Sequence, residues 1–234
     1  MKERLQRVEL LLGGEAMERL AATRVIVFGV GGVGGWCAEA LVRSGIGHIT
    51  IVDKDRVAAS NINRQVMAMT STIGRPKVEV LRERLLDINP ELDIKTVFGL
   101  YTADTQHEFA LDDYDFVIDA IDSLVDKALL ILNACESGAT LFSSMGAALK
   151  SDPRHIRTAE FWQAKGCPLA RALRNHFKRS GVFPKRKFKC VFSDELLSNK
   201  GMASESEPRA NGTLMHATAM FGLTLAEMVI EKRV

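Results

Sequence analysis

The chain has 234 residues, 47% of them hydrophobic, and a formal net charge of +2. This length can bury a sizeable core in one α/β domain, and the near balance of charge excludes a protein whose whole surface is basic. The four cysteines, at positions 37, 135, 167 and 190, form no C-x-x-C pair, which argues against a disulfide framework and a structural zinc site. The start, MKERLQRVELLLGG, lacks the apolar core of a signal peptide, so we expect a cytoplasmic protein.

A glycine-rich loop follows the first predicted strand. Residues 2–22 are predicted to form a helix that is free to pack on a neighbouring subunit, and the apolar run 25–28 indicates a strand of a parallel sheet. The glycines after this strand are Gly29, Gly31, Gly32, Gly34 and Gly35. Three of them match G-x-G-x-x-G, where the backbone can approach a phosphate and the next helix, predicted at 36–43, offers its free N–H groups. The alternative is that the glycines serve helix–sheet packing alone.

The residues after the second predicted strand, 49–52, favour nucleotidyl transfer over hydride transfer. Asp53 ends this strand at the spacing of an acid that accepts hydrogen bonds from ribose hydroxyls. The polar residues that follow it are Asn61, Arg64, Gln65, Arg75 and Lys77. Two fixed cations facing a triphosphate would offset the charge that builds up when the α-phosphorus is attacked, whereas a nicotinamide site needs no such cations.

The next elements alternate as in a doubly wound sheet. The patterns predict helix 75–88, strand 94–98, helix 102–109, strand 116–118, helix 125–137 and strand 141–143. Asp119 and Asp122 follow the strand 116–118, so they are expected to meet the glycine loop and Asp53 in one crevice. The predicted fold is α/β, a Rossmann-like doubly wound, mainly parallel sheet with an N-terminal helix. Residues 1–150 would form its core, and 151–234 an irregular C-terminal extension that completes the same domain.

The C-terminal third is predicted to contain a strand within 150–157, a helix at 168–181 and a mobile loop at 198–212. A last helix, predicted at 213–230, would be buried or face a dimer partner. Its uncharged part is too short to span a bilayer. Its basic residues are Arg171, Arg174, Lys178, Arg179, Lys185, Arg186, Lys187 and Lys189. They are equally compatible with contacts to RNA phosphates and with a solvated basic face.

Several separated motifs carry a family resemblance. GVGGVG, IVDKD, SNINRQ, GRPK and VIDAIDS resemble the superfamily of ubiquitin-activating-enzyme-like adenylyltransferases, which includes the thiamine and molybdopterin biosynthesis activators. Within it, RVELLLGG, VRSGIG, INPE, SSMGAA, DPRHIR, PLARALR and CVFSDE are most similar to the tRNA threonylcarbamoyladenosine dehydratases. The resemblance covers residues 4–195 and does not extend to the tail beyond them.

This resemblance implies an ATP-dependent adenylating enzyme that cyclises threonylcarbamoyladenosine in tRNA with loss of water. The implied ATP ligands are Gly29, Gly31, Gly32, Gly34, Asp53, Asp55, Asn61, Arg64, Gln65, Lys77 and Asp122. The implied catalytic residues are Arg64, Lys77, Asp122 and Arg7, of which Arg7 would cross a homodimer interface. Asp122 would hold Mg²⁺ beside the phosphates, and a monovalent cation is a further candidate cofactor.

Two other functions stay open. Related activators pass an acyl group from a ubiquitin-like or sulfur-carrier protein to a cysteine, and Cys167 lies beside Lys165 at a predicted helix start, a setting that can lower a thiol pKa. The C-x-x-C zinc pairs of that superfamily are missing here. A non-catalytic nucleotide-binding scaffold is the other alternative, against which the set Arg64, Lys77 and Asp122 speaks. Asp119 is assigned to the turn after its strand.

Overall fold

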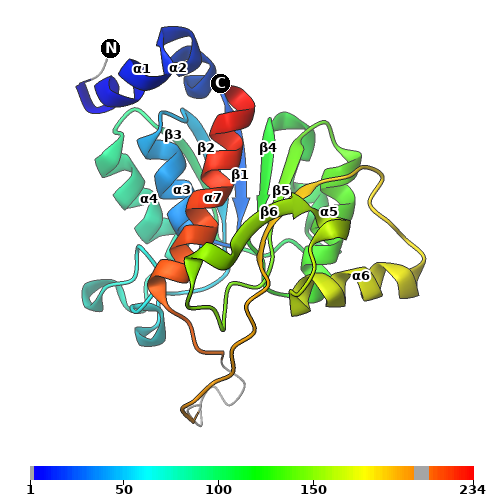
Figure 1. Cartoon of the computed structure of the whole chain (residues 1–234). Coiled ribbons are helices and arrows are strands. Elements are labelled where there is room, and N and C mark those ends of the chain that lie inside the picture. Colours follow the sequence, from blue (N-terminus) through cyan, green and yellow to red (C-terminus); the bar gives the residue numbers. More distant parts are fainter. Residues whose placement is uncertain (1–2, 203–210) are drawn as a thin grey trace.

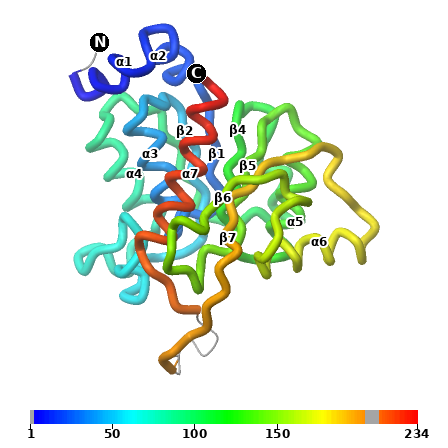
Figure 2. The backbone as a smooth tube through the Cα atoms, in the orientation of Figure 1, coloured from blue at the N-terminus to red at the C-terminus, as the bar shows by residue number. Residues whose placement is uncertain are grey.

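The protein is built on a seven-stranded sheet in the order β3-β2-β1-β4-β5-β7-β6 (Figures 1 and 2). Its computed structural model describes residues 3–202 and 211–234. The strands are β1 (Arg24–Phe28), β2 (His48–Val52), β3 (Asp93–Val97), β4 (Phe116–Asp119), β5 (Thr140–Ser144), β6 (Ile156–Glu160) and β7 (Lys189–Ser193). The pairs are parallel except β6 with β7. The predicted doubly wound α/β fold is therefore confirmed.

Helices cover both faces of this sheet. They are α1 (Gln6–Leu12), α2 (Gly14–Ala21), α3 (Gly34–Arg43), α4 (Lys77–Ile88), α5 (Leu124–Glu136), α6 (Pro168–Ser180) and α7 (Met215–Arg233). In Figure 1, α3, α4 and α7 lie on one face, and α5 and α6 lie on the other. Two buried apolar clusters, one on each side, hold these layers together.

The last helix confirms the prediction of a buried element. α7 packs along α3, and both apolar and small residues turn inward there. Gly222 permits this approach, because a Cβ at that position would overlap the carbonyl oxygen of Val33. Among the described residues, no helix combines the length and apolarity that crossing a membrane requires.

Two predicted elements differ from the structure. The N-terminal helix is broken at Gly13, whose φ of 82° separates α1 from α2. Residues 102–109 form no α-helix, only a short 3₁₀ turn, Gln106–Glu108. Thr105 Oγ1 donates to the Leu100 carbonyl and accepts from the Thr102 N–H. These side-chain hydrogen bonds compete with the backbone hydrogen bonds of an α-helix.

β7 extends the sheet beyond the strands that the sequence patterns predicted, and β6, Ile156–Glu160, overlaps the end of the strand predicted within 150–157. β7 pairs with β5 in parallel and with β6 in antiparallel register, so both strands come from the C-terminal third. Of the predicted mobile loop 198–212, residues 203–210 lie outside the described residues, and the rest contains neither helix nor strand.

The chain order reverses between β1 and β4. From β1 the chain proceeds through α3 to β2 on one side, whereas β4 continues through α5 to β5 on the other. The predicted crevice therefore corresponds to the carboxyl ends of β1 and β4, the position at which ligands bind in open α/β sheets.

Candidate active site

The glycine loop, residues 29–35, forms the turn from β1 into α3 at this position and is partly buried. Gly29 adopts a φ of 84°, and a Cβ there would lie 2.7 Å from the carbonyl oxygen of Ala120. A Cβ on Gly34 would overlap the Gly29 carbonyl oxygen, so these two glycines are required by the tight turn into α3. At Gly31 the nearest atom, Gln65 Nε2, would be 3.7 Å from a Cβ. Gly31 therefore leaves room for a ligand to reach the N-terminus of α3.

Asp53 connects the glycine loop to the segment after β2. Its Oδ2 accepts a hydrogen bond from the Val30 N–H at 2.8 Å, and its Oδ1 accepts one from the Asp55 N–H at 2.8 Å. Burial raises the pKa of Asp53, while the charge of Lys77 and the two backbone donors oppose that rise. Each carboxylate oxygen retains a second lone pair, with which it can accept a hydrogen bond from a ribose hydroxyl.

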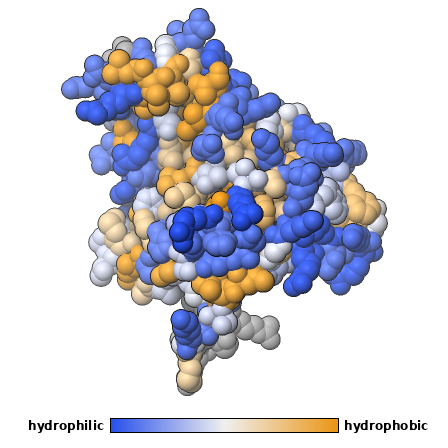
Figure 3. Space-filling view, viewed as in Figure 1, coloured by the Kyte–Doolittle hydropathy of each residue, from blue (hydrophilic) through white to orange (hydrophobic). Residues whose placement is uncertain are grey.

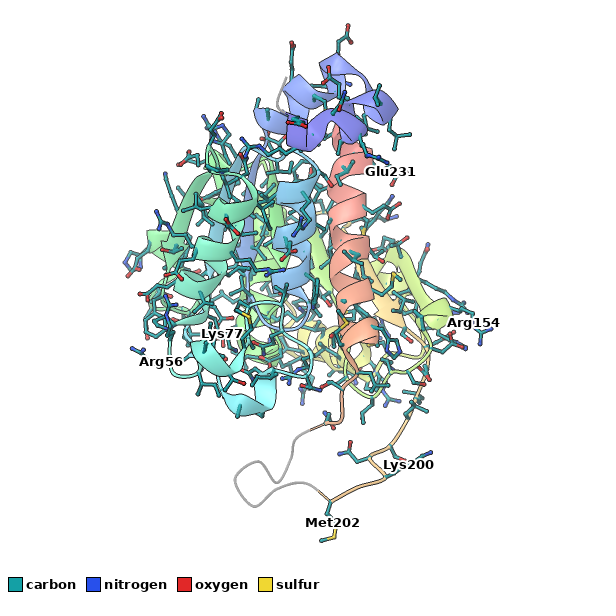
Figure 4. All side chains as sticks on the ribbon, turned by 90° about the vertical axis from the view of Figure 1, so that its left-hand side faces the viewer. Arg56, Lys77, Arg154, Lys200, Met202 and Glu231 are labelled. Carbon is teal, nitrogen blue, oxygen red and sulfur yellow. The ribbon has the colours of Figure 1, made fainter. Side chains whose placement is uncertain are left out.

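Lys77 brings a buried ammonium group to the same place. It is only 5% exposed, and its Nζ lies 2.8 Å from Asp55 Oδ2. The segment before α4 is held there by backbone hydrogen bonds, from the Lys77 N–H to the Asp55 carbonyl and from the Val57 N–H to the Arg75 carbonyl. In Figure 4, Lys77 lies toward the opposite end of the molecule from Glu231, which is in the last turn of α7.

Arg75 does not share this position, although the sequence patterns grouped it with Lys77. Its guanidinium group forms an ion pair with Glu83 on the exposed side of α4. One of the two cations that were expected from GRPK is thus occupied elsewhere. The cations that remain close to the glycine loop are Lys77 and Arg64.

The N-x-x-R-Q segment packs against the glycine loop. Asn61 Oδ1 accepts a hydrogen bond from the Ala58 N–H at 3.1 Å and so shapes the turn. The Arg64 side chain lies over Gly32, whose Cβ would be 3.2 Å from Arg64 Cγ. Arg64 Nη1 donates to the Ser60 carbonyl at 2.8 Å and to Asn63 Oδ1 at 3.1 Å, so acceptors of its own segment hold the guanidinium group.

Two further contacts fix this segment. Trp36, in the first turn of α3, donates its indole N–H to the Arg64 carbonyl at 3.0 Å. Gln65 is buried, and among the described residues its Oε1 has no hydrogen-bond partner. An unpartnered buried oxygen costs free energy unless a donor reaches it, so this amide beside Gly31 is consistent with a bound ligand.

The turn after β4 is organised by a buried ion pair. Lys127 Nζ lies 2.8 Å from Asp119 Oδ2, and both side chains are 0% exposed. Lys127 also donates to the Ile121 carbonyl at 2.9 Å. Asp119 Oδ1 accepts a hydrogen bond from the Ile121 N–H at 3.1 Å, and Asp119 Oδ2 accepts one from Ser143 Oγ at 2.5 Å. Asp119 therefore shapes the turn, as predicted.

Asp122 follows directly on this turn and is exposed. In the part of the chain that the structure describes, its carboxylate forms no ion pair, so it is available to a ligand or a metal ion. The neighbouring Ala120 carbonyl touches the position of the Gly29 Cβ, which places this turn against the glycine loop.

Arg7 lies far from these residues within one chain. It is an exposed residue of α1, which sits at the other end of the sheet, near the C-terminus (Figure 1). α1 buries none of its side chains, and Leu10 and Leu11 are 80% and 82% exposed. Figure 3 shows the hydrophobic surface over α1 and α2 at the top of the molecule.

The cysteines do not offer a nucleophile. All four are free and buried. Burial raises the pKa of Cys135 to about 11 and that of Cys190 to about 12, and it also raises the pKa of Cys37. Cys167 directly precedes α6 and is only 2% exposed, so it lacks the accessible setting that the sequence suggested.

Comparison with known proteins supports one family assignment. Residues 3–232 match the family described as the ThiF family. The chain belongs to the ThiF family.

Two bacterial tRNA threonylcarbamoyladenosine dehydratases resemble this chain over most of their length. The tRNA threonylcarbamoyladenosine dehydratase of Bacillus subtilis is 40% identical over 195 residues, which are 83% of this chain and 76% of that protein. The crystal structure of the Escherichia coli tRNA N6-threonylcarbamoyladenosine dehydratase, TcdA, in complex with AMP has a TM-score of 0.90 and 34% identity, and the match covers 99% of this chain and 94% of that one. The same protein in complex with ATP has a TM-score of 0.89 at 34% identity, with coverage of 99% and 93%.

Sequence reasoning missed two residues that shape the site of this ThiF-family protein. Lys127 carried no signal beyond its place in the predicted helix 125–137. Trp36 directly follows the glycine loop, but nothing in the sequence indicated that its indole N–H donates to the Arg64 carbonyl.

Proposed function

We propose that this protein is a tRNA threonylcarbamoyladenosine dehydratase, which uses ATP to activate the threonyl carboxylate of the modified adenosine and closes a ring. The observation that carries this proposal is the extent of the likeness to the E. coli enzyme. It spans nearly the whole chain, so it includes β6, α6, β7 and α7 as well as the glycine-loop half. A nucleotide site alone would support only adenylation.

ATP would occupy the crevice at the carboxyl ends of β1, β2 and β4. The open backbone at Gly31 and the N-terminus of α3 suit the phosphates, with Gly32 beneath the Arg64 side chain, and Asp53 suits the ribose. Lys77 and Arg64 supply positive charge beside the phosphates. Gln65, with its buried unpartnered oxygen, and Asn61 complete the loop that faces them.

Asp122 is the residue that we assign to Mg²⁺. Among the described residues, no group of three side chains could hold a metal ion. A single exposed carboxylate nevertheless suits Mg²⁺, which is commonly held by one or two carboxylates together with substrate phosphates. The bound ion would neutralise charge on the phosphates, and Asp55 is a second carboxylate near them that is partly satisfied by Lys77.

The proposed chemistry has two steps. A threonyl carboxylate oxygen attacks the α-phosphorus of ATP, a P–O bond to pyrophosphate breaks, and an acyl adenylate forms. The neighbouring carbamoyl group then attacks the activated carbonyl carbon, loses a proton and expels AMP. Lys77 and Arg64 would offset the negative charge that develops in the first step. The second step is intramolecular and benefits from a high effective concentration, so it requires no covalent nucleophile from the protein.

A homodimer completes this proposal. The exposed leucines of α1, Leu10 and Leu11, form an apolar surface that a second copy of the chain would cover. Arg7 on the same helix would then reach the crevice of that second copy. The free, buried cysteines suit a reducing compartment, and we therefore place the protein in the cytoplasm. A monovalent cation remains a proposed activator, to be tested by exchanging K⁺ and Na⁺ for tetramethylammonium.

The deciding experiment is turnover of defined substrates. Purified protein, ATP and Mg²⁺ are incubated with tRNA that carries threonylcarbamoyladenosine, and the nucleosides are analysed by mass spectrometry. We expect loss of one water from the modified nucleoside, together with AMP and pyrophosphate. Arg64→Ala should lose acyl-adenylate formation while it keeps the circular dichroism spectrum of the wild type. Pyrophosphate exchange that depends on a carrier protein with a Gly-Gly tail, and not on this tRNA, would reject the dehydratase.

Complementation tests the placement of Arg7. Arg7→Ala and Arg64→Ala should each be inactive alone if both groups serve one composite site. A mixture of equal amounts, allowed to exchange subunits, should recover about one quarter of wild-type turnover, because half of the dimers then contain one intact site of two. Full activity of Arg7→Ala alone, or no recovery in an exchanged mixture, would remove Arg7 from the site.

A further inference from the structure

We infer that α6 and its flanking aromatic residues form the surface on which tRNA docks, an inference that rests on the proposed function. The α6 surface is defined here by the exposed side chains Trp162, Arg171, Asn175, Lys178, Arg179 and Phe183. Nothing in the reaction chemistry above uses these residues.

The charge of this region is one-sided. Residues 161–193 contain nine Lys and Arg and no Asp or Glu. The structure separates these cations into two groups. Arg174 donates to the carbonyls of Phe161 and Ala164, and Arg186 donates to four carbonyls around the C-terminal end of α5. These two guanidinium groups are structural, which corrects the expectation of one uniform basic cluster.

The remaining cations of α6 face solvent. Arg171, Lys178 and Arg179 are exposed, and within residues 3–202 and 211–234 they form no ion pair, whereas Lys185 is paired with Glu136 at 3.0 Å. Unpaired cations without neighbouring acids retain their full attraction for phosphates.

These cations lie along one face of the helix. The buried side of α6 is formed by Ala170, Leu173 and Phe177, so positions 171, 175 and 178 lie together on the opposite side. Seven residues of helix from Arg171 to Lys178 span about 10 Å. At about 3.4 Å per phosphate along one strand, that length matches roughly three phosphates.

Two partly exposed aromatic rings adjoin this face. Trp162 is 36% exposed and Phe183 is 48% exposed, and their ring centroids are 6.0 Å apart with planes inclined by 42°. Trp162 also lies against Phe177, with ring centroids 6.5 Å apart, so its position is fixed from behind by the core of α6. Rigid aromatic faces beside a basic stripe are the arrangement on which unpaired bases stack.

The first turn of α6 lies beside the carboxyl end of β5. Leu169, in the first turn of α6, lies 3.6 Å from the position of a Cβ on Gly146, which follows β5. α5, which starts just after Asp122, packs along α6. Figure 1 shows α6 at the lower right, at the end of the sheet where the strands finish, and Figure 3 shows the surface over it as largely hydrophilic. RNA bound along α6 can therefore present an unpaired nucleoside to the crevice.

The polar character of the exposed face favours RNA over a membrane. An interfacial helix needs an apolar face turned outward, whereas the outward positions of α6 are Arg171, Asn175, Lys178 and Arg179. An acidic protein would satisfy the cations but would not explain the exposed rings beside them. RNA satisfies both features, since it offers phosphates and base faces together.

The test measures binding of an unmodified anticodon stem-loop RNA to the full-length protein without ATP, over a range of salt concentrations. The test variant is Lys178→Ala/Arg179→Ala. The matched control is Arg82→Ala/Lys95→Ala, which removes two exposed cations from α4 and β3 at the other edge of the sheet. Each lost phosphate contact should lower the slope of log affinity against log salt by about 0.7 to 0.9, so the test variant should lose about 25-fold to 60-fold in affinity at about 0.1 M salt. The control should bind as the wild type does.

Stacking gives an independent readout. Trp162→Ala should weaken binding by about fivefold to a hundredfold without changing the salt slope, whereas Trp162→Phe should retain most of the affinity. AMP affinity and thermal unfolding of the variants should match the wild type, which excludes a general folding defect.

The inference would be overturned if the α6 variants bound RNA with the affinity and salt slope of the wild type. It would also be overturned if Arg82→Ala/Lys95→Ala lost as much RNA affinity as Lys178→Ala/Arg179→Ala. Loss of binding to phosphatidylserine vesicles with RNA binding intact would instead assign the α6 surface to a membrane and would also overturn it. The proposed function fails separately, if wild-type protein does not cyclise modified tRNA. If the wild-type protein cyclises modified tRNA but the α6 variants bind RNA as well as it does, only the assignment of the docking surface is wrong.

Discussion

Replacing Lys127 by Met should destabilise the protein strongly, because it leaves the Asp119 carboxylate without its cation in the interior. Both side chains are 0% exposed and their charged atoms are 2.8 Å apart. The Ile121 carbonyl loses its donor in the same substitution. Removing one partner of a buried pair costs about 3–5 kcal/mol. For a chain of this size, about 2–4 °C per kcal/mol predicts a fall in Tm of about 6–20 °C.

The assay is urea unfolding followed by circular dichroism, with Lys95→Met as a surface control that should stay within about 0.5 kcal/mol of the wild type. The double variant Lys127→Met/Asp119→Asn should be less destabilised than Lys127→Met alone, because no unpaired charge remains and the amide oxygen still accepts from the Ile121 N–H. A loss below about 1 kcal/mol in Lys127→Met would refute the reasoning. So would a double variant whose loss equals the sum of the two single losses, because the groups would then be energetically independent.

Three further outcomes follow from single contacts. Burial raises the pKa of Asp53, so the ionised carboxylate that accepts hydrogen bonds from a ribose is lost as the pH falls through that raised value. The AMP affinity of the wild type should therefore decline toward acid pH more than the AMP affinity of Asp53→Asn. Titration calorimetry at several pH values measures both. Gly34→Ala should prevent folding or abolish AMP binding, because the added Cβ overlaps the Gly29 carbonyl oxygen. In Gly31→Ala the added Cβ lies 3.7 Å from its nearest atom, Gln65 Nε2, so this variant should fold with an unchanged Tm and bind AMP less tightly. Arg186→Ala should lose about 1–3 kcal/mol by leaving carbonyls at the end of α5 unpaired, while Lys187→Ala stays near the wild type in urea unfolding; equal effects of the two would contradict the structural role of Arg186.

Local patterns determined most of the nucleotide-binding half. A run of apolar residues followed by glycines has few other structural outcomes, because a strand buried on both faces must be continuously apolar and a tight turn into a helix must lack side chains. β1, α3 and β2 therefore formed where they were predicted, and Asp53 lies at the end of β2 beside the glycine loop. Spacing along one strand–helix–strand unit is enough to bring these groups together.

Only the tertiary structure decided which polar side chains are free to act. Arg75 and Lys77 are two residues apart, yet Arg75 pairs with Glu83 on the helix surface and Lys77 is buried and pairs with Asp55. Arg186 belongs to a basic run in the sequence, but carbonyls about fifty residues earlier in the chain take up its hydrogen bonds. The sequence shows that a charged side chain is present, but the group that it pairs with lies in another part of the chain and is known only from the structure. Burial then sets the cost of leaving that charge unpaired, and burial is a property of the packed layers rather than of any one segment.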